Sequence, residues 1–219
     1  MPLTWVLGHT EQNMRLLPLL GITAALLVGC ANPINERTAQ NYWAAGEEAL
    51  RSGNLPLARE NFRRTLINVQ VGNLGPVYEA QAAAKLARVE GNLCEYEEAD
   101  KTFQYALSSK MKAVGENSPA TFPLRIELAQ LSFDTGHFNK SIEYFERAFA
   151  VGGSTLESKD PADYAAMLDD YATALASTGK PAEAELARAR SSALRKSAGA
   201  MPSNSKGKSD YVPYPKSCK

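Results

Sequence analysis

The sequence predicts an all-α protein in which pairs of helices stack into a solenoid, and three observations indicate this fold class. Two short amphipathic segments follow one another between Phe122 and Ala150. A glycine, Gly136, stands between them. The same arrangement occurs again elsewhere along the chain. Because neither segment of a pair could bury its apolar face alone, each pair must pack on its neighbours.

The stretch from Phe122 to Ala150 shows the repeating unit most clearly. Apolar residues three or four positions apart give each segment one apolar face, as a helix requires. Gly136 suits the end of the first helix, where the backbone often needs a positive φ. The apolar positions are Leu124, Leu128, Leu131 and Phe133 in the first helix, and Ile142, Phe145, Ala148 and Phe149 in the second.

Turn glycines and small–aromatic pairs mark the repeat. We assign four glycines to the turns between paired helices, and they are 38, 45 and 43 residues apart. These glycines are Gly53, Gly91, Gly136 and Gly179. After each of the first three turns, a small residue precedes an aromatic one by four positions, so that the small side chain leaves room for the ring. The pairs are Ala58 with Phe62, Ala99 with Phe103, and Ser141 with Phe145, whereas Arg188 follows Ala184 in the last unit.

Helix-start signals place the other elements of the first half. Asn32 is a good N-cap and Pro33 a good first helical residue, and this first helix should run to about Arg51. The second unit begins near Pro76, in an alanine-rich helix suited to close packing. Its second helix is expected over about residues 95–112.

The last helix pair and the tail are defined by composition. Asp160 and Pro161 repeat the cap-then-proline signal and open the pair. The final helix has few large apolar residues, which suits the solvent-facing end of a solenoid. Residues 198–219 are rich in Ser, Pro, Gly and Lys without a period, and they are predicted to form a disordered, mildly basic tail. Contact of this tail with lipid headgroups or a partner is the alternative.

In these positions the chain resembles the tetratricopeptide repeat family. Residues 113–151 and 170–189 look like the longer, kinesin-light-chain-like variant of that repeat. The resemblance covers roughly residues 39–197 and implies a right-handed superhelical solenoid of about four helix pairs. It is loosest in the second repeat, where Gly91 and Ala99 are eight positions apart rather than five, so a longer turn is expected. The matching residues are Gly46, Gly53, Ala58, Phe62, Ala99, Phe103, Ala106, Ala129, Gly136, Phe145, Ala148, Ala172, Gly179 and Ala184.

The N-terminal segment resembles the signal peptide of a bacterial lipoprotein. Residues 16–29 follow Arg15 and are apolar, but they are fewer than the roughly 20 residues that a bilayer-spanning helix needs. Residues 27–30, which end in Cys30, resemble a lipobox. In that family the cysteine receives the lipid and the segment before it is removed. The alternative is an ordinary signal peptide with a chance cysteine.

The lipobox resemblance implies a layout and a location. Acyl chains such as palmitate on Cys30 would anchor the protein to a membrane. Ala31 follows the cysteine where an aspartate would favour inner-membrane retention, so the resemblance points to the outer membrane, facing the periplasm. The expected layout is residues 1–29 as signal peptide, with Met14 favoured as the true start, residues 30–38 as lipidated cysteine and start of the first helix, residues 39–197 as helical domain, and residues 198–219 as tail.

The sequence carries few signs of catalysis or of nucleic-acid binding. Basic and acidic residues balance at 24 each, which gives no electrostatic footprint for nucleic acid. His9 lies in or before the signal segment and His137 in a turn, so no histidine cluster is available for a metal, and no cofactor motif occurs. Cys94 and Cys218 could pair in an oxidising periplasm, with free or intermolecular thiols as the alternatives.

Two functions of different classes are open at this point. The first is a scaffold or assembly factor, not an enzyme, that presents a groove of first helices to a protein or peptide partner in the cell envelope, as the family resemblance implies. The second is a thiol-based enzyme or redox sensor that uses Cys94. We expect Lys85 and Gln130 on exposed helix faces, whereas a place in the core is an equal alternative for the apolar groove residues Trp43, Ile126 and Phe133. The expected groove residues are Trp43, Glu47, Gln81, Lys85, Ile126, Gln130, Phe133, Asp169 and Thr173.

Overall fold

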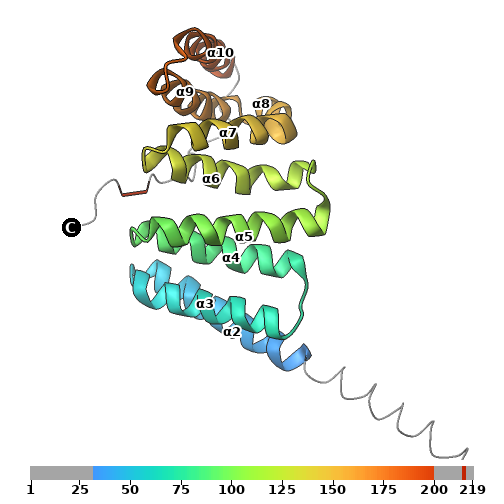
Figure 1. The fold of residues 1–219 in the computed structure, drawn as a ribbon. Coiled ribbons are helices and arrows are strands. Elements are labelled where there is room, and N and C mark those ends of the chain that lie inside the picture. The colour runs from blue at the N-terminus through green and yellow to red at the C-terminus, as the bar shows by residue number, and fades with distance from the viewer. Residues whose placement is uncertain (1–31, 200–213, 216–219) are drawn as a thin grey trace, which may run out of the picture.

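The computed structural model describes residues 32–199 and 214–215, and within these ranges every regular element is helical. The paired α-helices follow one another along the chain and stack in that order (Figure 1). They are α2 (Asn32–Arg51) with α3 (Leu55–Val71), α4 (Pro76–Asn92) with α5 (Tyr96–Val114), α6 (Phe122–Asp134) with α7 (Phe138–Ala148), and α9 (Pro161–Ser177) with α10 (Pro181–Gly199). The all-α solenoid of helix pairs is therefore confirmed.

The core lies between the two helices of each pair and between neighbouring pairs. Each predicted small–aromatic couple is buried where a second helix packs against a first one. Gly46 of α2 shows why small residues are needed, because a Cβ at this position would lie only 2.9 Å from the ring of Phe62. The members of these couples, Ala58, Phe62, Ala99, Phe103, Ser141 and Phe145, are all 0% exposed.

Within residues 32–199, the four turns inside the helix pairs have the same hydrogen-bond pattern, and this corrects one turn assignment. In each turn, one residue with positive φ is followed by a residue whose N–H reaches back five positions to the first helix, which is the Schellman motif. In the second pair the positive-φ residue is Cys94, with φ 64°, and not Gly91, which lies inside α4. Cys94 precedes Ala99 by five positions, so this turn is not longer than the others. The positive-φ turn residues are Gly53, Cys94, Gly136 and Gly179.

Two of the described α-helices, α3 and α9, begin with a side-chain N-cap, and the start of α9 was predicted from the sequence. Asn54 caps α3 by accepting a hydrogen bond from the backbone N–H of Leu57. Asp160 caps α9 in the same way, with Asp163 N–H as the donor and Pro161 as the first helical residue.

The link between the third and fourth pairs contains helical segments that were not predicted from the sequence. A π-helical turn, Phe149–Gly153, continues α7 and leads into the short α8 (Ser154–Lys159). Gly152 lies against Phe122, where a Cβ would come within 2.6 Å of the ring, so a side chain at this position would clash. A short 3₁₀ turn, Pro119–Thr121, joins α5 to α6.

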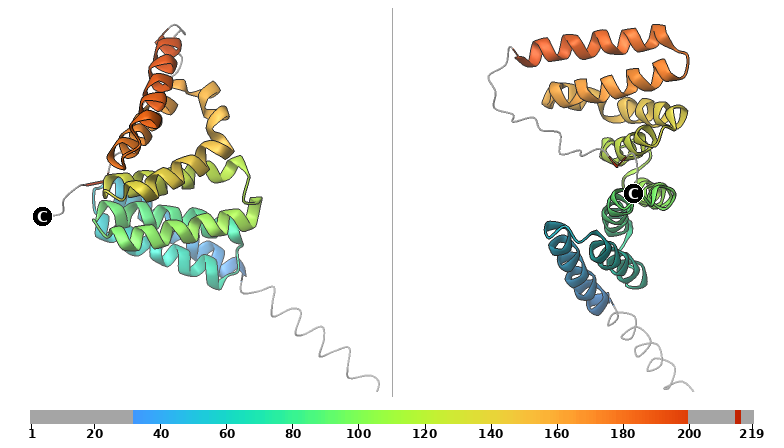
Figure 2. Two further views of the ribbon diagram at one scale, coloured as in Figure 1. Left: turned by 45° about the horizontal axis from the view of Figure 1, so that its top comes forward. Right: turned by 90° about the vertical axis from the view of Figure 1, so that its left-hand side faces the viewer.

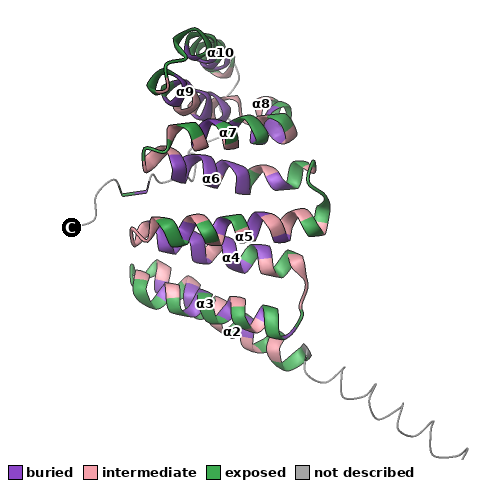
Figure 3. Ribbon diagram, in the orientation of Figure 1, coloured by how far each residue is buried: buried purple, intermediate pink, exposed green. Residues whose placement is uncertain are grey.

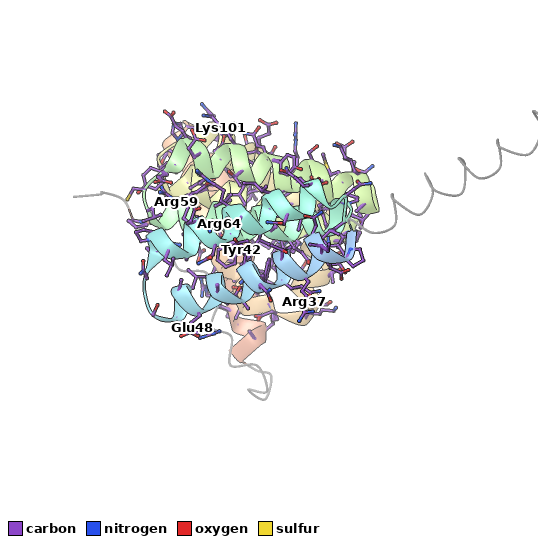
Figure 4. The ribbon with its side chains drawn as sticks, turned by 90° about the horizontal axis from the view of Figure 1, so that it is seen from below. Arg37, Tyr42, Glu48, Arg59, Arg64 and Lys101 are labelled. Atoms are coloured by element: carbon purple, nitrogen blue, oxygen red, sulfur yellow. The ribbon has the colours of Figure 1, made fainter. Side chains whose placement is uncertain are left out.

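The two ends of the stack differ from its middle in exposure. The helices α2 and α10 lie at opposite ends of the stack, as two further views show (Figure 2). Buried residues line α4 and α6 nearly all round, whereas α10 is mostly exposed and buries one face (Figure 3). Exposed Leu186, at 73%, confirms that the last helix is solvent-facing. At the opposite end, the guanidinium of Arg64 lies over the ring of Tyr42 at 5.4 Å and forms an ion pair with Glu60 (Figure 4).

Candidate partner-binding site

The first helices of the pairs, α2, α4, α6 and α9, form what we call the inner surface. A cavity of about 200 Å³ opens on it between α2 and α4, and we call this cavity the front groove. Its walls are mainly apolar, with Trp43 and Tyr78 as its aromatic residues and Gln40 and Gln81 as amides. The lining residues are Glu36, Ala39, Gln40 and Trp43 of α2, Thr65 and Val69 of α3, Leu74 of the link, and Tyr78, Gln81 and Ala82 of α4.

Four of the predicted groove residues gather at or beside the front groove. Trp43 is half-buried and packs edge-on against Phe62 at 5.6 Å, so it belongs partly to the core and partly to the groove wall. Lys85 forms a 2.7 Å ion pair with Glu47 and lies 5.7 Å from the Trp43 ring centroid. Gln81 is exposed at the groove. The positive charge of Lys85 is therefore already paired across the two helices.

The predicted groove residues on α6 and α9 lie elsewhere. Ile126 is 5% exposed and packs with Phe145 in the core. Gln130 is 4% exposed, so the expectation that it lies on an exposed face was wrong. The reason is that α6 is covered on several sides by neighbouring helices, as its nearly continuous run of buried residues shows. Phe133 is half-buried and packs edge-on against Phe138.

The two remaining groove candidates are on α9. Asp169 forms an ion pair with Arg195 of α10, and Thr173 is exposed with its hydroxyl bonded to the Asp169 carbonyl. These two side chains are not part of the front groove.

A second part of the inner surface is covered by the C-terminal residues Tyr214 and Pro215, which sequence reasoning placed in a featureless tail. Tyr214 is only 3% exposed and packs in the cluster that includes Leu124 and Leu128 of α6. Its backbone N–H donates to Asp134 Oδ2 at 2.9 Å. In Figure 1 the short coloured segment at residues 214–215 lies at the turn end of α6. We call this place the tyrosine site.

The tyrosine site is formed by both α4 and α6. The Tyr214 hydroxyl donates to Glu127 Oε2 at 3.2 Å, while Oε1 of the same carboxylate accepts from Arg88 at 2.7 Å. Burial, with the Glu127 carboxylate beside the hydroxyl, raises the pKa of Tyr214, so the hydroxyl is a neutral donor at all physiological pH values. Gly91 forms the floor, since a Cβ there would lie 2.5 Å from the ring.

Cys94 lies at the rim of the tyrosine site and is disulfide-bonded. The hydroxyl of Tyr96 lies 3.2 Å from Cys94 Sγ and donates to the carbonyl oxygen of Pro215. A cysteine with positive φ is uncommon, and such backbone conformations tend to cluster at functional positions. The five-residue spacing from Cys94 to Ala99 was the signal in the sequence that could have found this turn.

The described residues contain no group of three or more His, Cys, Asp or Glu side chains positioned to hold a metal ion. His137 is exposed in its turn, as expected, with Nδ1 2.9 Å from the Thr135 hydroxyl. It borders a second cavity of about 170 Å³, whose lining includes the ion pair between Lys140 and Asp100. Within the same described ranges, no helix combines the length and apolar character that crossing a bilayer requires.

Comparison with known proteins bears on the fold. No family model matches the sequence, and no curated protein matches it. Several solved structures are similar, at low sequence identity. BtubC (BKLC) from P. vanneervenii superposes with a TM-score of 0.69 at 19% identity, over 81% of this chain and 71% of that one. MamA gives a TM-score of 0.57 at 13% identity, over 80% of this chain and 90% of that one.

A third similar structure connects the fold to the repeat seen in the sequence. The putative kinesin light chain of Podosopora anserina with nearly identical TPR-like repeats gives a TM-score of 0.61. The identity is 19%, over 76% of this chain and 78% of that one. The residues that the structure describes form four helix pairs with identical turns, and the chain has the fold of a tetratricopeptide-repeat-like helical solenoid.

Proposed function

We propose that this protein is a membrane-anchored scaffold or assembly factor that binds a protein partner in the bacterial cell envelope through the front groove. The observation that carries the proposal is the groove itself, an apolar cavity between α2 and α4 with two aromatic residues and two amides. Repeat solenoids generally use such inner surfaces to bind protein segments. We assign no catalytic step to the chain.

The size and lining of the front groove favour one anchoring side chain of a peptide. About 200 Å³ is below the range of pockets that enclose a small-molecule ligand. An apolar anchor could pack against Trp43 and the 52% exposed Tyr78, while Gln40 and Gln81 offer hydrogen bonds to a peptide backbone. Aromatic residues flanked by polar groups are typical of such anchors.

The proposed anchor is a lipid on Cys30. The lipobox resemblance of residues 27–30 supports this anchor, and Cys30 lies only two positions before Asn32, where α2 begins. A domain joined so directly to its anchor would hold the front groove close to the bilayer. More than one acyl chain is needed for stable anchoring, because a single chain binds only reversibly.

Site-specific photo-crosslinking tests the groove. A photoreactive residue in place of Gln81, which is exposed at the groove, should capture a partner in the native envelope. The matched control is the same replacement at Gln104, which is exposed on α5 away from the groove. Adding Tyr78→Ser should abolish capture from position 81, because it removes an aromatic wall without disturbing the core. If capture is equal from both positions, or is unaffected by Tyr78→Ser, the front groove is not the binding site.

Lipid labelling tests the anchor separately. Protein expressed with labelled palmitate should carry the label, and Cys30→Ser should lose both the label and stable membrane association. Cys218→Ser is the matched cysteine control and should retain both. Absence of label from the wild-type protein would show that the lipoprotein proposal is wrong, while leaving the groove untouched.

The second candidate function, a thiol-based enzyme or redox sensor, rests on Cys94. A nucleophilic cysteine must be a thiolate, whereas Cys94 is disulfide-bonded in the structure. The catalytic version is therefore the weaker candidate. Rapid reaction of Cys94 with a thiol reagent in the native protein would favour the catalytic function.

A further inference from the structure

Tyr214 and Pro215 are held on the inner surface in the manner of a bound peptide. The segment makes a backbone hydrogen bond to Asp134, a side-chain hydrogen bond to Glu127 and a backbone-carbonyl contact with Tyr96. These three partners come from α6 and α5, and the ring itself is buried against Gly91 of α4. A combination of ring burial with main-chain hydrogen bonds is how grooves recognise extended peptides.

We propose that the tyrosine site is a second binding site on the inner surface, specific for an extended Tyr-Pro segment, which the chain's own C-terminus occupies while a Cys94–Cys218 disulfide holds it in place. Reduction of that disulfide frees the C-terminal segment and opens the site to a Tyr-Pro segment of another chain. The proposal is independent of the lipid anchor and of the front groove.

The geometry around Tyr96 supports Cys218 as the partner of Cys94. The other cysteines of the chain are Cys30 and Cys218. The Tyr96 hydroxyl contacts both Cys94 Sγ and the Pro215 carbonyl, so residue 215 lies beside the bonded sulfur. Cys218 follows three positions later, and three residues of extended chain span up to about 10 Å. That reach covers the gap from Pro215 to Cys94 with slack.

The site selects tyrosine through complementary features. Gly91 leaves space for an aromatic ring that any larger residue would fill. Glu127 accepts a hydrogen bond from the phenolic hydroxyl, and Arg88 forms an ion pair with the same carboxylate. Phenylalanine would leave this partly buried carboxylate oxygen without its donor, at a cost in affinity. Glu127 is the feature that separates tyrosine from other aromatic residues.

The opening step is an ordinary dithiol–disulfide exchange. A thiolate of a dithiol reductant attacks one sulfur of the Cys94–Cys218 bond, and the other sulfur leaves as a thiolate and takes up a proton. The second thiol of the reductant then displaces the remaining cysteine, which is also protonated. The reductant ends as a disulfide and the protein as two thiols, so two electrons and two protons are transferred.

The first experiment maps the disulfide and follows Tyr214 in the full chain. Non-reducing peptide mapping should find Cys94 joined to Cys218 within one chain. A fluorotyrosine at position 214 should give one ¹⁹F signal from a buried ring when oxidised, and a second signal from a solvent-exposed ring after dithiol treatment. Cys94→Gly should show the exposed signal without reductant and should remain folded, because glycine suits the positive φ of that turn.

The second experiment measures access to the site with a probe. A fluorescent peptide of residues 210–217, DYVPYPKS, should bind the reduced protein or Cys94→Gly at least about tenfold more tightly than the oxidised protein, because a tethered occupant competes at high effective concentration. The same peptide with phenylalanine at position 214 should bind more weakly. Gly91→Ala in the reduced protein should abolish binding while leaving helix content unchanged.

Three results would overturn the proposal. Cys94 could be found as a free thiol, joined to Cys30, or joined to Cys218 of a second copy. The fluorotyrosine signal could stay at its buried-ring position after complete reduction, which would show that the C-terminal segment remains bound without the disulfide. The probe peptide could bind the oxidised and reduced forms equally.

Discussion

Gly91 of α4 packs so closely against Tyr214 of the C-terminal segment that an added methyl group would clash with the ring. A Cβ on Gly91 would lie 2.5 Å from the tyrosine ring. Gly91 itself is inside a helix, where glycine is unfavourable compared with alanine. The glycine therefore lowers the intrinsic stability of α4 and is compensated by the burial of Tyr214.

This contact predicts that the effect of Gly91→Ala on the free energy of unfolding has opposite signs in the wild-type chain and in a chain that lacks the Tyr214 ring. Gly91→Ala should lower the free energy of unfolding in the wild-type chain, because it expels the ring. In a Tyr214→Ala background the same change should raise that free energy by about 0.5–1 kcal/mol, through helix propensity alone. Urea unfolding of the four proteins measures the coupling. Additive effects would mean that the two residues do not contact each other.

Ala148 of α7 is fully buried, in a cluster with Phe145 of the same helix, Ile126 of α6 and Met167 of α9. Ala148→Arg should cost on the order of 3 kcal/mol, through overpacking and a buried charge. Ala150→Arg, two positions along and exposed, should change stability by less than about 0.5 kcal/mol. Thermal unfolding of both variants tests whether position 148 faces the core and position 150 faces solvent. Equal melting temperatures would contradict that assignment.

The Lys85–Glu47 ion pair joins α4 to α2 with both side chains about one-third exposed, at 30% and 29%. Lys85→Glu should lower stability by no more than about 1 kcal/mol, because it places two carboxylates together in a partly solvated site. The exchanged pair Lys85→Glu with Glu47→Lys should recover most of that loss. Unfolding at low and high salt measures both effects, and failure of the exchange to restore stability would show that Lys85 acts through its packing on Trp43.

Glu90 is 4% exposed, and one of its carboxylate oxygens has no hydrogen-bond partner. Burial raises the pKa of the Glu90 carboxyl above its ordinary value of 4.5. The folded state therefore holds this proton more tightly than the unfolded state, so the stability contributed by protonated Glu90 is present below pH 4.5 and is lost as the pH rises through the folded pKa.

Glu90→Gln keeps the shape of the side chain and removes this ionisation. The variant should melt at a higher temperature than the wild-type protein at pH 7, and the difference should shrink towards pH 4. Other titrating groups are common to both proteins and cancel in the comparison. A difference in melting temperature that stays constant from pH 4 to pH 7 would show that Glu90 does not titrate in this range.

The elements of this fold could be predicted because their signals are local. A helix places residues four positions apart on one face, so Ala58 with Phe62 indicates both the helix and its buried side. Asp160 and Pro161 are neighbours in the sequence and act on adjacent backbone groups, so the start of α9 could be read without knowing what packs on it. The second turn was misplaced because a glycine was expected where Cys94 supplies the positive φ.

The sequence by itself determined that helices pair, where they begin and end, and that the pairs must stack to bury their apolar faces. Only the tertiary structure decided which polar residues are accessible. Gln130 is buried because α6 has neighbours on several sides, and that coverage depends on how successive pairs rotate. It also decided that Tyr214 lies in the tyrosine site. Tyr214 contacts Gly91 and Glu127, which are distant from it in the chain, through close packing and a hydrogen bond. The sequence of the tail has no periodic pattern that would predict these contacts.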